Sequence, residues 1–261
     1  MQDELFSVEG QVVLVSGGSR GIGRALAEGF ASRDAQVIIA GRDARTLEET
    51  AGQISRGTHD VAWEVCDVAK PEDVNALVAR VIDKYSHIDT LLNVAGVNKR
   101  MKAENYSLEE YDWIVDINLR GAFVMAQAVG RHMISRRAGQ IVNVDSLNTY
   151  APLIGAAPYA MSKAGVLMMT RALGNEWGRH GVRVNSIAPG FFPTALTGKM
   201  WTEEKMLTWA HANTPLKKLG EVEELVGAAI FLASPASSYV TGQTIRVDGG
   251  FTAGLNWPLD L

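Results

Sequence analysis

The chain has 261 residues, of which 47% are hydrophobic and 21% are charged, a composition typical of a soluble globular protein. Its formal charge of −4 gives no indication of a nucleic-acid partner, and its single cysteine excludes an intrachain disulfide and a cysteine-based zinc site. The acidic start lacks a basic region followed by an apolar run, and no apolar stretch reaches the ~20 residues of a membrane span. We therefore expect a cytoplasmic protein that does not bind membranes.

Short segments rich in valine and isoleucine alternate with segments whose apolar residues recur every three or four positions. Ser107 and Glu110 form a capping box, and Pro71 suits the first position of a helix. Such alternation predicts one α/β domain over residues 1–261, a Rossmann-type doubly wound parallel sheet of about seven strands with helices on both faces. The expected strands are residues 11–16, 36–40, 59–65, 87–93, 139–145, 182–188 and 243–247.

The stretch 191–215 is the only long interval without an expected strand. Its Trp201, Met206 and Trp209 suggest a helical lid over a substrate pocket. A plain surface helix would have the same pattern, so both interpretations stay open.

A glycine-rich turn follows the first expected strand and precedes a helical segment that starts at Arg24. Free backbone N–H groups and the positive end of a helix dipole meet at such a turn, and glycines let the backbone approach a pyrophosphate. This position predicts a dinucleotide site. The residues of the turn expected to contact the cofactor are Gly17, Ser19, Arg20, Gly21, Ile22 and Gly23.

Tyr159 and Lys163 are four residues apart and would share one face of a helix. A nearby ammonium, together with an oxidised nicotinamide ring, favours the phenolate and would lower the tyrosine pKa toward a useful range. Tyr159 could then exchange a proton with a substrate oxygen. Ser146, at the carboxyl end of an expected strand, could hydrogen-bond the same oxygen. A solvated helix face and a strand-end serine that caps a turn are the alternatives.

The glycine spacing is GxxxGxG rather than GxGxxG, and this pattern resembles the short-chain dehydrogenase/reductase family. The resemblance extends from about residue 8 to about residue 251. It implies that Asn118 holds a water linking Lys163 to solvent, and that Asn118, Ser146, Tyr159 and Lys163 form the catalytic set, with no metal. It also implies a homotetramer built through the helices that carry Asn118 and Tyr159. Asp145, directly before Ser146, is unusual, and we predict no role for it.

Further matches to the family follow in chain order and imply contacts with the cofactor, to which Tyr159 and Lys163 also belong. Val94 replaces the usual second asparagine of an NNAG signature, and the segment 247–250 matches the C-terminal strand end. The implied cofactor contacts are Asp67, Val68, Asn93, Ala95, Gly96, Pro189, Gly190 and Thr194.

The end of the second expected strand indicates which cofactor is used. An acidic residue there would bind the ribose diol and repel a 2′-phosphate, but the place is occupied by Gly41 and followed by Arg42. Arg42 and Arg20 could bind a phosphate through charge-assisted hydrogen bonds. We therefore expect NADP(H) in preference to NAD(H), unless Asp43 reaches the ribose instead.

The residues expected to line the substrate pocket are Asn98, Lys99, Arg100, Asn148, Tyr150 and Phe192. Lys99 and Arg100 could pair with a substrate carboxylate, or form a solvated basic loop. The segments AGVNKR and APGFFPT resemble the sugar-acid branch of the family, which implies a keto-sugar acid such as 5-keto-gluconate. A 3-oxoacyl thioester reductase, with a carrier-protein surface built from the arginines of 131–137, a general ketone reductase and a non-catalytic dinucleotide sensor are the alternatives.

Overall fold

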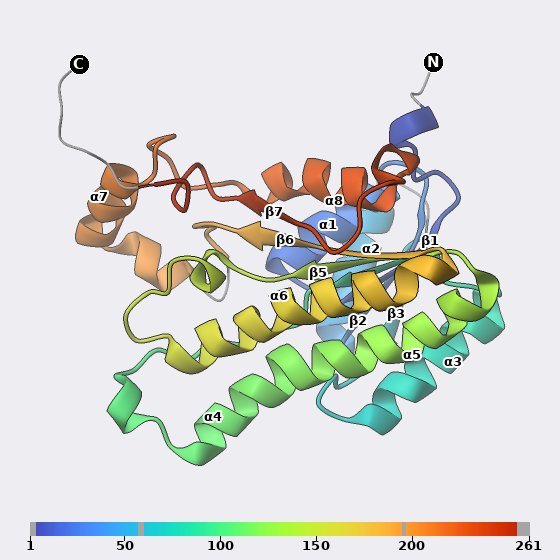
Figure 1. Ribbon diagram of the computed structural model, residues 1–261, viewed down its shortest axis with the longest axis horizontal. Coiled ribbons are helices and arrows are strands. Elements are labelled where there is room, and N and C mark those ends of the chain that lie inside the picture. The colour runs from blue at the N-terminus through green and yellow to red at the C-terminus, as the bar shows by residue number, and fades with distance from the viewer. Residues whose placement is uncertain (1–3, 57–59, 195–196, 255–261) are drawn as a thin grey trace.

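The computed structural model describes residues 4–56, 60–194 and 197–254. Its centre is a parallel sheet of seven strands in the order β3-β2-β1-β4-β5-β6-β7, which confirms the predicted fold class (Figure 1). Each strand falls inside its predicted segment or extends one residue beyond it. His59, the first residue of the third predicted strand, is outside the described residues. The strands are β1 (Val12–Ser16), β2 (Gln36–Gly41), β3 (Ala62–Val65), β4 (Thr90–Asn93), β5 (Gly139–Val144), β6 (Val182–Pro189) and β7 (Thr244–Val247).

Helices cover both faces of the sheet, as alternating buried side chains require. In β1, Val13 and Val15 join the core beneath α1, α2 and α8, while Val12 and Leu14 join the core beneath α3, α5 and α6. The helices are α1 (Gly21–Ala31), α2 (Ala44–Ser55), α3 (Pro71–Tyr85), α4 (Leu108–Val115), α5 (Gly121–Arg136), α6 (Ala157–Trp177), α7 (Glu204–Asn213) and α8 (Val226–Ala233).

Two predicted helix starts are confirmed. The Ser107 hydroxyl accepts a hydrogen bond from the Glu110 backbone N–H at 3.2 Å, and the Glu110 carboxylate accepts one from the Ser107 backbone N–H at 3.1 Å. This reciprocal capping box begins α4. Pro71 occupies the first turn of α3, where its missing N–H costs nothing.

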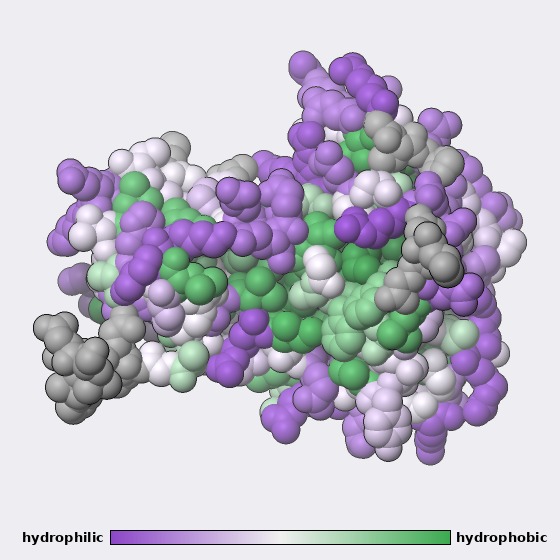
Figure 2. All heavy atoms as spheres, turned by 90° about the horizontal axis from the view of Figure 1, so that it is seen from above, coloured by the Kyte–Doolittle hydropathy of each residue, from purple (hydrophilic) through white to green (hydrophobic). Residues whose placement is uncertain are grey.

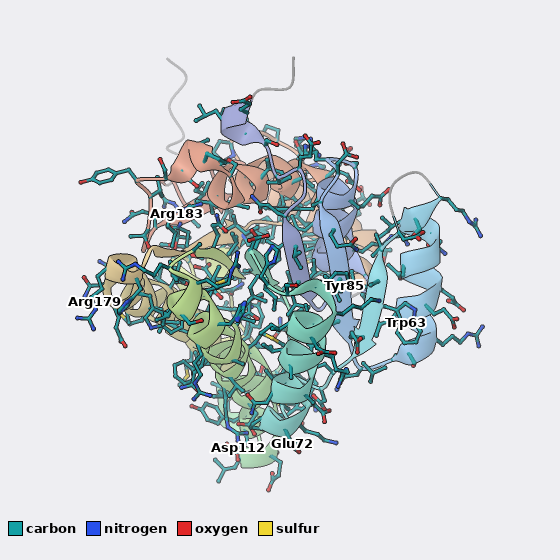
Figure 3. All side chains as sticks on the ribbon, turned by 90° about the vertical axis from the view of Figure 1, so that its right-hand side faces the viewer. Trp63, Glu72, Tyr85, Asp112, Arg179 and Arg183 are labelled. Carbon is teal, nitrogen blue, oxygen red and sulfur yellow. The ribbon has the colours of Figure 1, made fainter. Side chains whose placement is uncertain are left out.

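Arg183 of β6 ties the sheet to the C-terminal part of the chain (Figure 3). Its guanidinium donates to the carbonyl of Leu232 at 2.8 Å, to the hydroxyl of Ser237 at 2.6 Å and to the carbonyl of Ser234 at 3.2 Å. A cation at the C-terminal end of a helix also opposes the negative end of its dipole. Arg183 therefore fixes the end of α8 against the sheet.

The strand order reverses between β1 and β4, which places a crevice at the carboxyl ends of these strands. Loops that follow β1, β4, β5 and β6 meet there, so the fold itself selects this edge for a ligand site. Within the described part of the chain, no helix is both long and apolar enough to cross a lipid bilayer.

Candidate active site

A cavity of about 710 Å³ opens at the carboxyl ends of the strands. Its wall contains most residues that the sequence singles out, although they are spread over positions 17–194 of the chain. The predicted residues on the wall are Gly17, Ser19, Arg20, Gly21, Ile22, Gly23, Arg42, Asp67, Val68, Ala95, Gly96, Asn98, Arg100, Ser146, Asn148, Tyr159, Lys163, Pro189, Gly190, Phe192 and Thr194.

The turn after β1 has a shape that only glycine permits. Gly17 has a φ of +78°, and a Cβ placed on it would lie 2.8 Å from the Cα of Ala95. A Cβ on Gly23 would lie 2.1 Å from the carbonyl oxygen of Gly17. The close approach leaves the backbone at the start of α1 open toward the cavity, which fits a pyrophosphate group.

The far end of the cavity is basic. Arg20 and Arg42 are both exposed and line the wall beside Gly41. Asp43 also lies on the wall, but its carboxylate caps α2 by accepting the Thr46 backbone N–H at 2.7 Å and the Thr46 hydroxyl at 2.5 Å. These two hydrogen bonds lower the pKa of Asp43. The carboxylate therefore already has partners within its own helix.

Ser146, Tyr159 and Lys163 meet where β5 ends and α6 begins. The Ser146 hydroxyl accepts hydrogen bonds from the Asn148 backbone N–H at 3.1 Å and from its side-chain amide at 3.3 Å. The Lys163 ammonium donates to the Val144 carbonyl at 2.8 Å and lies 5.8 Å from the centre of the Tyr159 ring. A hydroxyl, a phenol and an ammonium thus share one end of the cavity.

Burial dominates the acid–base character of this group. It raises the pKa of Tyr159, although Ser146 and the Arg100 guanidinium act in the opposite direction. It also lowers the pKa of Lys163 to about 8. For the protein alone, burial therefore outweighs the lowering of the Tyr159 pKa expected from the Lys163 ammonium, which is directed to a backbone carbonyl. The lowering expected beside an oxidised nicotinamide ring stays a prediction.

Asn118 lies behind the cavity wall and is only 1% exposed. Its side-chain amide donates to the Val97 carbonyl at 2.9 Å and to the Ser162 hydroxyl at 3.1 Å, and its oxygen accepts the Val97 N–H at 2.7 Å. A Cβ on Gly96 would lie 3.3 Å from that oxygen and 3.5 Å from the Lys163 nitrogen. Asn118 thus holds the loop after β4 close to Lys163.

The helix containing Asn118 has a feature that the sequence did not reveal. Residues Asp116–Arg120 form a single π-helical turn between α4 and α5, in which the Gly121 N–H donates to the Asp116 carbonyl. A π turn leaves the regular ladder of backbone hydrogen bonds incomplete, and such turns are frequent at functional sites. No sequence pattern marks it.

Besides Asn118, three predicted residues are not brought to the cavity wall. The Lys99 ammonium forms an ion pair with Glu110, so the capping box of α4 binds it outside the cavity. Tyr150 is 39% exposed, and its ring lies 5.3 Å from the Arg246 guanidinium. Asn93 is buried and donates to the Ala122 carbonyl at 2.9 Å and to Asn143 at 3.2 Å, which links neighbouring strands instead.

The segment after β6 builds an aromatic wall that includes a residue with no predicted contact. Trp201 is 7% exposed and packs on Phe191 at 5.3 Å between ring centres. Its indole N–H has no hydrogen-bond partner among the described residues, and Asn98 has a similarly unpartnered oxygen. Both side chains line the cavity, so each offers a free polar atom to a ligand.

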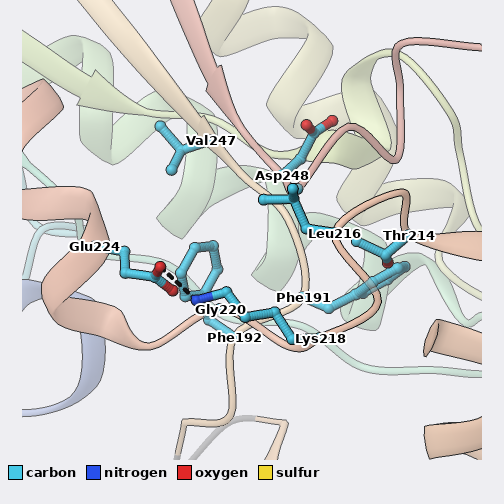
Figure 4. A pocket seen from close by; sticks show the side chains of 10 residues that line it. Phe191, Phe192, Thr214, Leu216, Lys218, Gly220, Glu224, Val247 and Asp248 are labelled. Carbon is cyan, nitrogen blue, oxygen red and sulfur yellow. Dashed lines mark hydrogen bonds and ion pairs between the residues drawn. The ribbon is translucent and has the colours of Figure 1, made fainter.

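A second, smaller cavity of about 80 Å³ adjoins this wall (Figure 4). Phe191 and Phe192 line both cavities, and Lys218 and Glu224 form an ion pair of 2.6 Å beside the smaller one. A Cβ on Gly220 would lie 2.3 Å from the ring of Phe192. Close packing therefore fixes this ring between the two spaces.

Known proteins that resemble this chain along nearly its whole length include dehydrogenases and reductases. The gluconate 5-dehydrogenase of Gluconobacter oxydans is 40% identical over 97% of this chain and 98% of that protein. The 5-keto-D-gluconate 5-reductase of Escherichia coli K12 is 34% identical over 95% of this chain and 98% of that protein. A 3-oxoacyl-(acyl-carrier-protein) reductase of Vibrio cholerae is 36% identical over 94% and 98%.

A solved structure has the same fold along nearly the whole chain. The gluconate 5-dehydrogenase from Burkholderia cenocepacia J2315, in complex with NADP and tartrate, matches with a TM-score of 0.93 and 36% identity, over 97% of this chain and 99% of that one. Residues 16–252 also match the family model described as enoyl-(acyl carrier protein) reductase. The chain therefore belongs to this short-chain dehydrogenase/reductase family of NAD(P)-dependent oxidoreductases, whose dehydrogenases act on CH–OH groups.

Proposed function

We propose that this protein interconverts a keto-sugar acid such as 5-keto-gluconate and its secondary alcohol, with NADP(H) preferred over NAD(H). The observation that carries the proposal is the meeting of Ser146, Tyr159 and Lys163 with the glycine turn and Arg100 in one cavity. The nicotinamide cofactor, when bound, exchanges a hydride with the substrate carbon.

The proposed chemistry assigns one role to each side chain. Ser146 and Tyr159 donate hydrogen bonds to the substrate oxygen, where negative charge develops during reduction. Tyr159 delivers the proton, and the Lys163 ammonium, 5.8 Å from its ring, favours the phenolate that remains. Asn118, through its hydrogen bonds to Val97 and Ser162, keeps the proton path next to Lys163 ordered.

The preference for NADP(H) is supported by the two arginines at the end of β2. Arg20 and Arg42 present exposed guanidinium groups beside Gly41, which occupies the position where an acidic residue would repel a phosphate. Asp43 is engaged by Thr46, which makes it a poor ligand for a ribose diol. The relative from Burkholderia cenocepacia binds NADP, in agreement with this proposal.

The proposed substrate is supported by the chemistry of the cavity wall. Arg100 offers a cation for a carboxylate, and Asn98 and Trp201 offer unpartnered polar atoms for hydroxyl groups. The Asn148 amide also lines the wall, but it already donates to Ser146 and accepts from Leu153. Tartrate, a hydroxy acid, accompanies NADP in the Burkholderia cenocepacia relative. We further propose that the segment 191–215 closes over this substrate as a lid of the single domain; residues 195–196 are outside the described part.

Reduction of a carrier-bound 3-oxoacyl thioester is the main alternative, but two of the three arginines proposed for its carrier surface make contacts far from the cavity. Arg136 donates to the Ile88 carbonyl at 3.3 Å and to Asp89 at 3.2 Å, and Arg137 donates to the Arg179 carbonyl at 3.3 Å. These contacts lie at the amino ends of β4 and β5, on the opposite edge from the cavity. The six residues of β5 separate the two edges by about 20 Å.

Loss of reduced-nicotinamide absorbance, measured with NADPH and with NADH, tests the proposed reaction. Purified protein is offered 5-keto-gluconate, a 2-keto-sugar acid, an acetoacetyl thioester and an uncharged cyclic ketone, with Tyr159→Phe as the blank. We expect turnover of a keto-sugar acid with NADPH, and a Tyr159→Phe variant that binds NADPH but does not turn over. Turnover of only the thioester or the cyclic ketone would overturn the proposed substrate.

A dinucleotide sensor without turnover is the alternative from another class. A binding module has no use for a proton relay, whereas the buried Lys163 and the Asn118 network are costly to maintain. If wild-type protein and Tyr159→Phe bound NADPH equally well and neither turned over any substrate, the sensor would replace the enzyme as the proposal.

We also propose a homotetramer, which needs two different self-complementary surfaces on each subunit. One surface is the outer side of α4, α5 and α6, which lie side by side (Figure 1). On these helices Trp113, Phe123, Met161 and Met168 are each at least 41% exposed. The other is the face over α8 and β7, where hydrophobic side chains gather (Figure 2). Such exposed apolar groups favour association.

A further inference from the structure

Asp145 is a buried carboxyl that the proposed mechanism does not use. It follows β5 directly, is 2% exposed and lines the cavity next to Ser146. Its backbone N–H donates to the Ile187 carbonyl at 2.9 Å, and its Oδ1 accepts the Ser146 N–H. Its Oδ2 is buried and has no hydrogen-bond partner among the described residues. A buried carboxyl with a free oxygen is costly unless a charge compensates it.

Lys163, on the neighbouring helix α6, is a buried cation that likewise needs a compensating charge. Its side chain is 4% exposed, and the hydrogen bond found for its ammonium goes to the carbonyl of Val144, the residue before Asp145. A carbonyl satisfies one donor but supplies no negative charge, and buried charges in proteins are normally paired. The carboxyl of Asp145 is the anionic group that acts on this ammonium.

The groups that face Asp145 come from three elements. Lys163 and Tyr159 belong to α6, Tyr150 and the Thr149 hydroxyl follow β5, and the Ser186 hydroxyl belongs to β6. Of these, Lys163 is the cation. The Arg100 guanidinium, which also lines the cavity, acts on Tyr159. The hydroxyls of Thr149 and Ser186 favour the ionised form of Asp145, although neither forms a hydrogen bond to its Oδ2.

The two buried groups titrate in the same range. Burial raises the pKa of Asp145 to about 7, against the pull of the Ser146 N–H and Lys163. Burial lowers the pKa of Lys163 to about 8, against the pull of Asp145. The Asp145 carboxylate also raises the pKa of Tyr159. The charge on Asp145 thus bears on both members of the proposed proton relay.

We propose that Asp145 is a positioning residue whose carboxylate is the counter-charge of Lys163, keeps Lys163 and Tyr159 in their protonated forms, and so sets the pH range of the relay. This proposal rests on the proposed roles of Tyr159 and Lys163. It goes beyond them because it assigns the choice of pH range to a residue outside the catalytic set. Carbonyl reduction requires a protonated Tyr159 that can donate its proton to the substrate oxygen. Asp145 therefore favours carbonyl reduction at neutral pH.

Asp145→Asn tests the proposal because it removes the charge while its amide oxygen can still accept the Ser146 N–H. The carboxylate stabilises the protonated forms of Lys163 and Tyr159, so its removal lowers both pKa values. The alkaline limb of kcat/KM for reduction and the acidic limb for oxidation should therefore both move to lower pH, by about one unit. Asp83→Asn, at an exposed carboxylate of α3, is the matched control and should move neither limb.

A second measurement needs no turnover. The phenolate absorbance of Tyr159 is obtained as the difference between a protein and its Tyr159→Phe version, in the wild-type and in the Asp145→Asn backgrounds. The midpoint should lie about one pH unit lower in the Asp145→Asn background. A wild-type protein without turnover but with this shift would reject the proposed function and support the role of Asp145.

Asp145→Ser, which is also neutral and polar, replaces Asp145→Asn if the latter does not fold, as judged by circular dichroism. An equal loss of rate at every pH, with both limbs and the phenolate midpoint unmoved, would show that Asp145 serves only the packing of the β5 end. That result would overturn the proposal.

Discussion

Lys99 and Arg100 are adjacent basic residues with different surroundings. Lys99 is held by Glu110, which also caps α4, whereas Arg100 lines the cavity and acts on Tyr159. Sequence alone treats them as one basic pair, because it does not show which side chain a neighbouring helix will bind. Their difference makes them a matched pair for testing recognition of a carboxylate.

Arg100→Gln should raise the KM for a keto-sugar acid about 10- to 100-fold, the cost of losing a charge-assisted hydrogen bond. Lys99→Gln should change that KM less than about threefold, because an exposed ion pair contributes little. Initial rates of NADPH oxidation over a range of substrate concentrations measure both. Equal effects of the two substitutions would exclude Arg100 as the specific ligand.

Arg42 can be tested in the same way against Arg45, an exposed arginine of α2 that pairs with Glu49 at 2.8 Å. Arg42→Gln should lower the ratio of kcat/KM for NADPH to that for NADH by about tenfold or more, because a phosphate loses a guanidinium partner. Arg45→Gln should leave the ratio unchanged. A ratio that Arg42→Gln did not alter would remove this residue from cofactor selection.

At the scale of elements, the steric role of glycine in the turn between β1 and α1 can be distinguished from the effect of glycine on helix propensity. A methyl on Gly23 would collide with the Gly17 carbonyl, whereas nothing lies within 4 Å of a Cβ on Gly52 in α2. Gly23→Ala should abolish binding of NADPH, measured by nucleotide fluorescence. Gly52→Ala should leave binding intact and raise the free energy of unfolding in urea by about 0.5–1 kcal/mol. Retained binding in Gly23→Ala would contradict the proposed cradle.

The elements that sequence predicted best depend on local chemistry. The seven strands, the capping box at Ser107 and the start of α3 at Pro71 follow from composition, spacing and short-range hydrogen bonds. The π turn at Asp116–Arg120, the Lys163 bond to Val144 and the position of Tyr150 could not be predicted. Each depends on which side chains meet after the sheet has formed, and no local pattern contains that information.

At the scale of the whole molecule, the excess of apolar residues on α5 and α6 has two causes. Met125 and Val166 are buried in the core beneath the sheet, so part of the excess belongs to the fold of one chain. Met168 and Met161 are 57% and 56% exposed, seven residues apart on α6, and therefore lie along one side of this helix. A surface of this kind without a partner is costly in water.

Met168→Lys should therefore reduce the assembly, because two copies of α6 facing each other across a two-fold axis would bury two new charges. Light scattering after size exclusion at micromolar concentration should give four times the chain mass of 28.2 kDa for the wild type and half of that or less for the variant. Val65→Lys, at an exposed apolar residue of the edge strand β3, should remain tetrameric, because lysine is common on sheet edges. A wild-type monomer would contradict the tetramer, and a tetrameric Met168→Lys would place the interface elsewhere.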